Sequence, residues 1–198
     1  MVINPSAERA APHSQVIEDY AKAIYKLERA GEAGEAVSNS ALAEALGVSP
    51  GAITGMLKRL EELELIAYEP YKGASLTPAG ERVALEVMRH HRLLEAYLAE
   101  VLGMPWDRVH EEAEVLEHAI SPELSELIAA KLGNPTHDPH GDPIPTADGE
   151  IERASSRRLG DLEQGECGVF VRVSDSDPEM LRWLSERGIA PGDRLEVL

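Results

Sequence analysis

Two short amphipathic segments joined by Gly47-Val48-Ser49 constrain the fold of this chain more than any other feature. The first, residues 40–46, reads as a short helix that ends at Gly47. Ser49 and Pro50 then have the character of an N-cap followed by a proline at the first helical position. The second segment places its apolar residues at helical spacing: Ile53, Met56, Leu57, Leu60 and Leu63. This order predicts a helix-turn-helix.

The helix-turn-helix is flanked by segments that complete a winged domain. Upstream, residues 14–30 carry an apolar helix face, and Ser14 is the expected N-cap. Downstream, residues 65–68 and 74–76 read as two short strands around Tyr71-Lys72-Gly73, the pattern of a wing. A helical hairpin used only for packing would not need this wing. We therefore predict a winged helix-turn-helix domain over residues 14–80.

The remaining chain is helical at first and mixed at its end. Helices are expected over residues 77–102, 105–119 and 121–132, and their long aliphatic stripes favour a helical dimer interface. Residues 134–150 lack periodicity and read as a structural linker. A strand, a helix and a strand are expected at 168–173, 178–187 and 193–198. The predicted fold is mainly α, with a helical domain at 81–145, a linker at 146–158 and a short α+β segment at 159–198.

The net charge of −17 is unusual for a protein with a DNA-reading motif, so its distribution matters. Residues 83–150 hold fourteen acidic and four basic side chains, and six of the seven histidines. A solvated acidic surface would explain the charge alone, but acid combined with histidine at helical spacing favours cation binding. The acidity also predicts weak non-specific affinity for DNA. No apolar run approaches the roughly 18 residues of a membrane span.

One group of acidic and histidine residues points to a metal site. Glu114, Glu117 and His118 stand at i, i+3 and i+4, so a helix would place them on one face, with His110 one turn earlier. Burying two carboxylates and an imidazole is costly unless a positive charge neutralises them. A divalent metal ion accepts these oxygen and nitrogen ligands. A metal site beside a DNA-reading domain predicts a metal-sensing regulator.

Two rival classes fit the residues less well. A metalloenzyme of the zincin type would need a second histidine at Glu114, and a di-iron carboxylate enzyme would need a glutamate at Val115. The chain is therefore not expected to be an enzyme. A winged-helix regulator that senses a small organic ligand, with the acidic and histidine cluster structural, remains the alternative. Such a regulator would need an aromatic-lined pocket, whereas aromatic residues make up only 4% of this chain.

The recognition helix supplies candidate DNA contacts. Its N-terminal residues would lie against base edges in the major groove. These candidates are Ser49, Pro50, Gly51, Ala52 and Thr54. Because the side chains are small, much of the discrimination would come from van der Waals contact and DNA shape. Phosphates would be contacted by Thr54, Lys58, Arg59 and, from the wing, Lys72.

Several motifs follow one another in order over residues 14–145. They are Glu18-Asp19-Tyr20, Ile24-Tyr25-Lys26-Leu27, Leu76-Thr77-Pro78-Ala79-Gly80, Arg89-His90-His91-Arg92-Leu93-Leu94-Glu95, residues 109–118, and Pro139-His140-Gly141-Asp142-Pro143-Ile144-Pro145. In this ordered set the chain resembles the diphtheria-toxin-repressor family of metal-dependent regulators. Residues 160–197 are similar to the start of the FeoA-like, SH3-type third domain of that family. The chain ends before such a barrel would close, so we expect a partial third domain.

The resemblance implies two sets of metal ligands. The primary, activating site would comprise Asp19, Glu114, Glu117 and His118. The ancillary site would comprise His91, Glu95 and His110, with Asp175 or Asp177 from the third domain as further candidates. The resemblance gives no metal role to His140, which lies in the linker, and His90 is expected to be exposed.

The resemblance also bears on the metal and on the partners. Iron-type members carry methionine and cysteine where this chain has Asp19 and Glu114, so its primary site resembles the manganese type. Hard oxygen ligands suit Mn(II), and Fe(II) is the second expectation. The implied function is a cytoplasmic, homodimeric regulator of metal-ion homeostasis genes. Its partner would be a double-stranded, pseudo-palindromic DNA operator, bound when the metal is bound.

Overall fold

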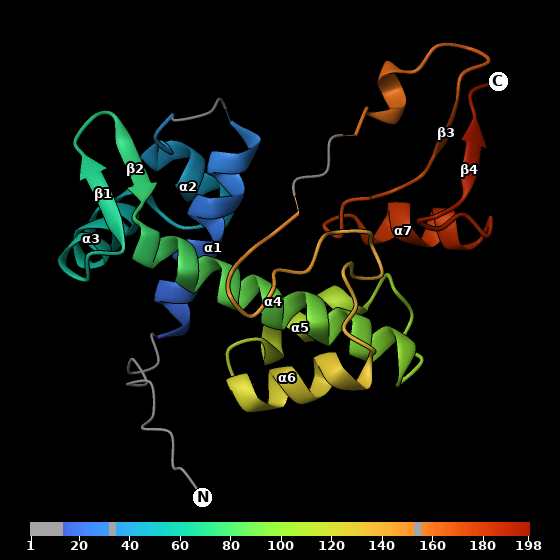
Figure 1. Cartoon of the computed structure of the whole chain (residues 1–198). Coiled ribbons are helices and arrows are strands. Elements are labelled where there is room, and N and C mark those ends of the chain that lie inside the picture. Colours follow the sequence, from blue (N-terminus) through green and yellow to red (C-terminus); the bar gives the residue numbers. More distant parts are fainter. Residues whose placement is uncertain (1–13, 32–34, 153–155) are drawn as a thin grey trace, which may run out of the picture. The chain divides into compact units, whose positions relative to one another are not determined.

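The computed structural model describes residues 14–31, 35–152 and 156–198, and its elements are labelled in Figure 1. The chain divides into two compact units, Met1–Ala84 and Leu85–Leu198. The long helix α4, Pro78–Glu100, crosses the division. Among the described residues, no helix is both long enough and apolar enough to cross a membrane.

The first unit contains the helix-turn-helix that the sequence predicts. Helix α1, Gln15–Ala30, precedes α2, Asn39–Leu46, and α3, Pro50–Glu62. Gly47 ends α2 in the left-handed conformation, with φ of 63°, and the Ser49 hydroxyl accepts a hydrogen bond from the Ala52 N–H at 3.4 Å. The core of the first unit contains the fully buried residues Ile24, Leu42, Ile53, Leu57 and Leu60.

The wing is a two-stranded antiparallel sheet of β1, Ile66–Glu69, and β2, Gly73–Leu76. Each strand begins one residue away from its predicted start. Gly73 has φ of 126°, and a Cβ there would lie 2.3 Å from the carbonyl oxygen of Val37. Val37 pairs with Ala74 on the side of β2 away from β1. Because a side chain at position 73 would collide with the Val37 backbone, only glycine fits there.

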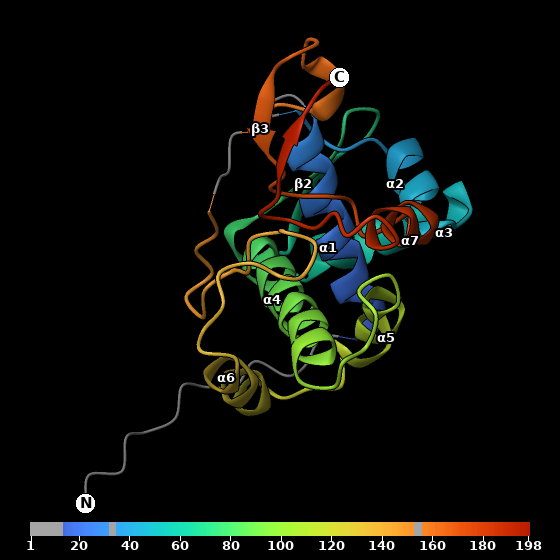
Figure 2. The ribbon, with the colours of Figure 1, turned by 90° about the vertical axis from the view of Figure 1, so that its right-hand side faces the viewer.

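The helices of the second unit pack around a small aliphatic core. Helix α5, Val109–Leu116, and helix α6, Pro122–Lys131, lie against α4 in both Figure 1 and Figure 2. Leu93 and Leu94 of α4, Ala113 of α5 and Ile128 of α6 are buried together. Helix α5 is shorter than predicted: residues 106–108 form a turn before it, and Glu117 is already its C-cap.

The segment after α6 has no helix or regular strand, as the linker prediction requires, yet it is firmly packed. Asp138, His140, Ile144 and Pro145 are buried. The Asp138 carboxylate accepts hydrogen bonds from the N–H groups of His140 and Asp142, at 2.8 and 2.9 Å, and so closes a tight turn. The backbone of this segment is therefore held by local side-chain hydrogen bonds, which carry no periodic signature.

The C-terminal part contains a short α+β arrangement. It comprises a 3-10 turn η1, Leu159–Asp161, strand β3, Cys167–Val169, helix α7, Pro178–Ser185, and strand β4, Arg194–Glu196. Strands β3 and β4 pair antiparallel, and the described residues of this part show this two-stranded sheet without a closed barrel. The predicted mainly α fold with a short α+β segment is confirmed.

Candidate metal centre

The candidate ligands of the second unit come from α4, from α5 and from the residues just after α5. His91 and Glu95 are one helical turn apart on α4, and His110 and Glu114 are one turn apart on α5. Glu117 and His118 follow at the end of α5. Packing of α5 on α4 therefore turns two i, i+4 pairs toward each other.

Three of these side chains, together with Asp175 from the segment before α7, form what we call the second cluster: His91, Glu95, His110 and Asp175. The Glu95 Oε1 atom lies 3.1 Å from His91 Nε2 and 3.3 Å from His110 Nδ1. The Asp175 Oδ2 atom approaches His110 Nδ1 to 3.2 Å. One potential ligand atom from each residue lies within 4.8 Å of the others, a spacing that a single metal ion can span.

Glu114, Glu117 and His118 form what we call the first cluster, and Glu117 joins it to the second. Glu117 is fully buried; its Oε1 lies 3.2 Å from His118 Nε2 and its Oε2 lies 2.5 Å from His91 Nδ1. Glu114 is partly exposed, and its Oε1 lies 3.7 Å from His91 Nδ1. The two oxygens of one carboxylate thus face imidazoles of two clusters.

The buried charges of the second cluster shift one another's pKa values. Hydrogen bonds with Asp175 and Glu95 raise the pKa of His110 to about 10. Burial alone would lower the pKa of His91, but hydrogen bonds with Glu117 and Glu95 outweigh it and raise that pKa. Burial would raise the pKa of Glu95, but the neighbouring imidazoles of His110, His140 and His91 hold it well below its usual range. The imidazolium proton of His110 therefore offsets carboxylate charge when no metal does.

The residues fit a divalent metal. The second cluster offers two imidazole nitrogens and two carboxylate oxygens, a donor set used for Mn(II) and Fe(II). Glu95 Oε2 is buried and makes no hydrogen bond within the described part of the chain. A carboxylate so placed is costly to bury without a cation, and a metal on its other oxygen would offset that cost.

The structure places the other predicted site residues as follows. Asp177 is the N-cap of α7 and accepts from the N–H groups of Glu179 and Met180, so of the two aspartates only Asp175 lies in the cluster. Asp19 lies on α1 of the first unit. The expectation that His90 is exposed is wrong: His90 is buried, and its Nδ1 lies 3.3 Å from the carbonyl oxygen of Glu117.

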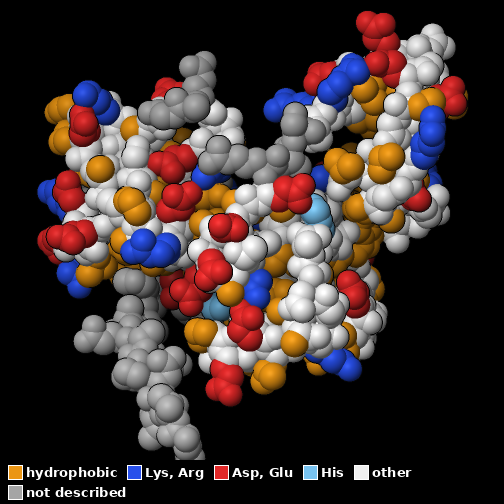
Figure 3. Space-filling model, in the orientation of Figure 1, with side chains coloured by type: hydrophobic (Ala, Val, Ile, Leu, Met, Phe, Trp, Pro, Cys, Tyr) orange, Lys and Arg blue, Asp and Glu red, His pale blue; other side chains and the backbone are white. Residues whose placement is uncertain are grey.

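The predicted DNA contacts lie on the surface of the first unit. Ser49, Pro50, Gly51 and Ala52 are exposed at the start of α3, and Thr54 is half-buried one turn further on. The basic candidates Lys58, Arg59 and Lys72 are exposed. Arg59 pairs with Glu62 at 3.0 Å and Lys72 with Glu69 at 2.6 Å, surface pairs weak enough to exchange for phosphates. Figure 3 shows that acidic side chains, in red, are spread over much of the visible surface.

Sequence reasoning missed one neighbour of the second cluster. Asp138, His140 and Glu95 form a buried group of potential ligand atoms within 4.8 Å. The motif Pro139-His140-Gly141-Asp142 was the available signal, but its lack of periodicity made it read as a linker.

A winged helix-turn-helix unit, followed by helices that hold clusters of carboxylates and imidazoles, defines a metal-dependent DNA-binding regulator. The models of three domain families match the chain: iron-dependent repressor, N-terminal DNA-binding domain, at residues 13–74; iron-dependent repressor, metal binding and dimerisation domain, at 77–146; and FeoA domain at 157–198. The chain belongs to the iron-dependent repressor family, whose members are metal-dependent transcriptional repressors. An organic-ligand sensor is not favoured.

Relatives and solved structures agree with this assignment. The chain is 33% identical over 193 residues to the iron-dependent repressor IdeR of Mycobacterium leprae, covering 91% of this chain and 82% of that protein. It is 32% identical over 192 residues to the diphtheria toxin repressor of Corynebacterium efficiens, with the same coverage. A manganese-dependent transcriptional repressor in complex with manganese superposes with a TM-score of 0.83 at 43% identity, over 92% of this chain and 83% of that one. These similarities support Mn(II) or Fe(II) as the bound metal.

Proposed function

We propose that this chain is a Mn(II)-responsive repressor whose DNA-binding unit is controlled through Asp19, Glu114, Glu117 and His118. The observation that carries the proposal is buried Glu117, whose two oxygens face His118 and His91. Carboxylate ligands without cysteine or methionine favour Mn(II) over later metals. The manganese-dependent repressors among the similar structures support the same metal.

In this proposal, metal controls DNA binding because each unit contributes a carboxylate to the metal site. A bound metal supplies positive charge, and that charge removes the repulsion between acidic side chains brought together. Asp19 is proposed to join the first cluster as a metal ligand. The metal would then hold α1, and with it the recognition helix α3 of the same unit, in one orientation. Without this neutralisation, Asp19 and Glu114 repel, and the orientation of the DNA-binding unit is not fixed. Ligand binding to one arrangement thereby changes affinity for DNA.

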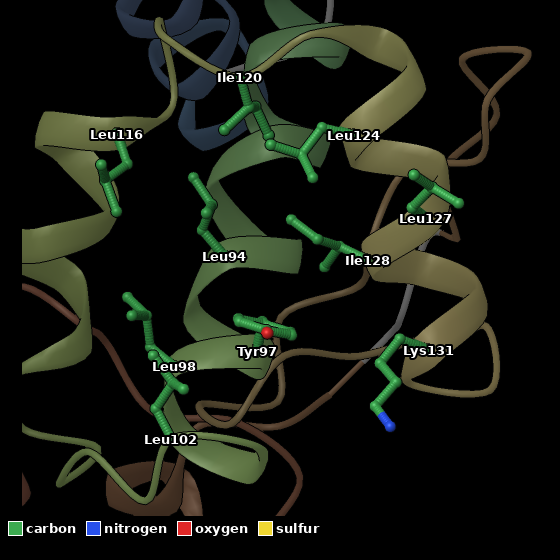
Figure 4. A pocket seen from close by; sticks show the side chains of 10 residues that line it. All are labelled: Leu94, Tyr97, Leu98, Leu102, Leu116, Ile120, Leu124, Leu127, Ile128 and Lys131. Carbon is green, nitrogen blue, oxygen red and sulfur yellow. The ribbon is translucent and has the colours of Figure 1, made fainter.

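We propose that homodimerisation uses an apolar groove between α4, α5 and α6. Figure 4 shows aliphatic side chains from these three helices converging on the groove. Leu102 and Leu127 are 61% and 62% exposed there, and Leu116 and Leu124 are also exposed. Contiguous exposed leucines in this number are characteristic of an interface. The occupant is a second copy of the chain, because residues 77–146 match a dimerisation domain.

The proposed dimer would bind a pseudo-palindromic operator in the cytoplasm, upstream of metal-ion homeostasis genes. Two-fold symmetry in the protein requires half-sites one helical turn or a multiple of it apart. The small side chains at Ser49, Gly51 and Ala52 would lie near base edges, and Lys58, Arg59 and Lys72 near phosphates.

A DNA-binding titration tests the proposal. Binding to the promoter of a metal-uptake operon is measured with Mn(II), with Fe(II) under anaerobic conditions, and with chelator. We expect binding with metal and none with chelator, at lower concentrations of Mn(II) than of Fe(II). His118→Ala should abolish metal-dependent binding and leave a folded dimer, whereas the exposed His137→Ala is the matched control. Equal binding in all three conditions would refute the proposal.

A further inference from the structure

The outer edge of the wing strand β2 is held by two different groups of the first unit. One edge of β2 pairs with β1, and the N–H groups of the other edge point toward the rest of the unit. There the Ala74 N–H donates to the Val37 carbonyl oxygen at 2.9 Å. The next N–H along this edge, that of Leu76, donates to the Glu28 Oε1 atom at 3.0 Å. A carboxylate of α1 therefore takes the place of a neighbouring strand.

Glu28 carries its charge at an unfavourable position. It lies in the last turn of α1, where the helix dipole disfavours a negative charge, and it is half-buried. Burial raises the pKa of Glu28, and repulsion from Glu81 adds to that rise. The hydrogen bond from Leu76 and the nearby charge of Arg29 oppose the rise without cancelling it. The charge of this carboxylate therefore destabilises the unit, and what the carboxylate provides in return is an acceptor for β2.

The contact with Glu28 fixes the direction of a short hairpin. Strand β2 spans only Gly73–Leu76, and a two-stranded sheet by itself is marginally stable. The bonds to Val37 and Glu28 hold this strand at Ala74 and at Leu76. Lys72 comes immediately before β2, and its own N–H closes the wing turn on the carbonyl oxygen of residue 69 at 3.1 Å. The position of Lys72 is thus set by how β2 is held.

We propose that Glu28 is the positioning residue of the wing: its carboxylate fastens the outer edge of β2 to α1 and so places Lys72 against an operator phosphate. The inference rests on the proposed function, in which Lys72 is a phosphate contact. Glu28 also lies on the helix that carries Asp19, so a wing fastened in this way follows any change in the orientation of α1.

Removing the Glu28 carboxylate should loosen the wing and leave the unit folded. The aliphatic core of the unit and the bridge between Val37 and Ala74 do not depend on this side chain. Charge alone predicts the opposite effect on DNA binding, because loss of a carboxylate lowers the repulsion between the unit and phosphates. Weaker operator binding by a Glu28 variant would therefore report the position of the wing rather than the charge of the unit.

Titrations of the metal-uptake promoter with the full chain and saturating Mn(II), at several salt concentrations, test the inference. Glu28→Ala should weaken binding as much as Lys72→Ala does and lower the salt slope by about 1, since both variants lose the same phosphate contact. The double variant should bind no more weakly than Lys72→Ala. Glu28→Gln, which keeps an acceptor oxygen, should restore both affinity and slope. Glu61→Ala, which removes an exposed carboxylate from α3 of the same unit, should not weaken binding.

The outcomes separate the inference from the function on which it rests. An unchanged affinity and slope with Lys72→Ala would remove the phosphate contact itself, and the inference with it. If Lys72→Ala weakens binding, three results overturn the positioning role: wild-type binding by Glu28→Ala, no recovery with Glu28→Gln, or an altered Mn(II) affinity of Glu28→Ala in calorimetry without DNA. If circular dichroism shows that Glu28→Ala does not fold, Glu28→Asp decides by the same comparison, because its shorter side chain draws the acceptor back from Leu76.

Discussion

Proton release on metal binding is the most direct consequence of the charges in the second cluster. The pKa of His110 is raised to about 10, so this imidazole holds its proton near neutral pH when no metal is bound, and the pKa of His91 is also raised. Glu95, whose pKa is lowered, has none to lose. Metal ligation requires neutral imidazole, so binding at this cluster must expel the His110 proton.

The size of the pH effect on metal affinity follows from the number of protons expelled. One proton makes the apparent association constant rise about tenfold per pH unit, and two make it rise about a hundredfold. In an Asp19→Ala variant, which removes a proposed ligand of the first cluster and keeps the second cluster, raising the pH from 6.5 to 8 should therefore strengthen Mn(II) binding by a factor of at least ~30. His110 alone accounts for that factor.

Calorimetry in two buffers of different ionisation enthalpy measures the proton number directly. Asp175→Asn is the informative variant, since its hydrogen bond is the largest cause of the raised His110 pKa. This variant should bind Mn(II) more weakly and with a shallower pH dependence. Identical enthalpies in both buffers, together with an affinity that does not vary with pH, would refute the reasoning.

Four further outcomes follow from the structure. In the metal-free protein the raised pKa of His110 stabilises the fold fully below about pH 6.5, and this contribution is lost as the pH rises toward 10, as thermal melts should show. Leu93→Ala empties a fully buried position and should cost about 3–5 kcal/mol in the free energy of unfolding, measured by denaturant titration. Leu127→Glu places a charge in the apolar groove and should shift the dimer toward monomer in sedimentation, whereas an unchanged dimer would place the interface elsewhere. Lys58→Ala should lower the salt slope of operator binding by about 1, and an unchanged slope would remove Lys58 from the phosphate contacts.

The sequence predicted best those features that depend on local chemistry. Gly47, Ser49 and Pro50 specified the turn of the helix-turn-helix because each has one favoured place at a helix end. The spacing of His91 and Glu95, one helical turn apart, likewise predicted a pair that lies together. In these cases the determining contacts are within a few residues along the chain.

Features that depend on distant contacts were not predictable in the same way. Spacing did not distinguish Asp175 from Asp177, because the choice depends on which one caps α7 and which one reaches α5. The linker prediction for the segment after α6 missed the burial of His140, since its packing depends on Trp106 and Glu95, both more than thirty residues away. The burial of His90 depends on the end of α5 in the same way.

The position of Glu117 has a consequence for how steeply the protein responds to metal concentration. One buried carboxylate faces an imidazole of each cluster, so ordering it at one cluster lowers the conformational cost of filling the other. Two sites coupled through a shared side chain fill together rather than independently. We therefore expect a threshold in occupancy instead of a gradual rise, so that a modest change in available metal separates two distinct levels of transcription.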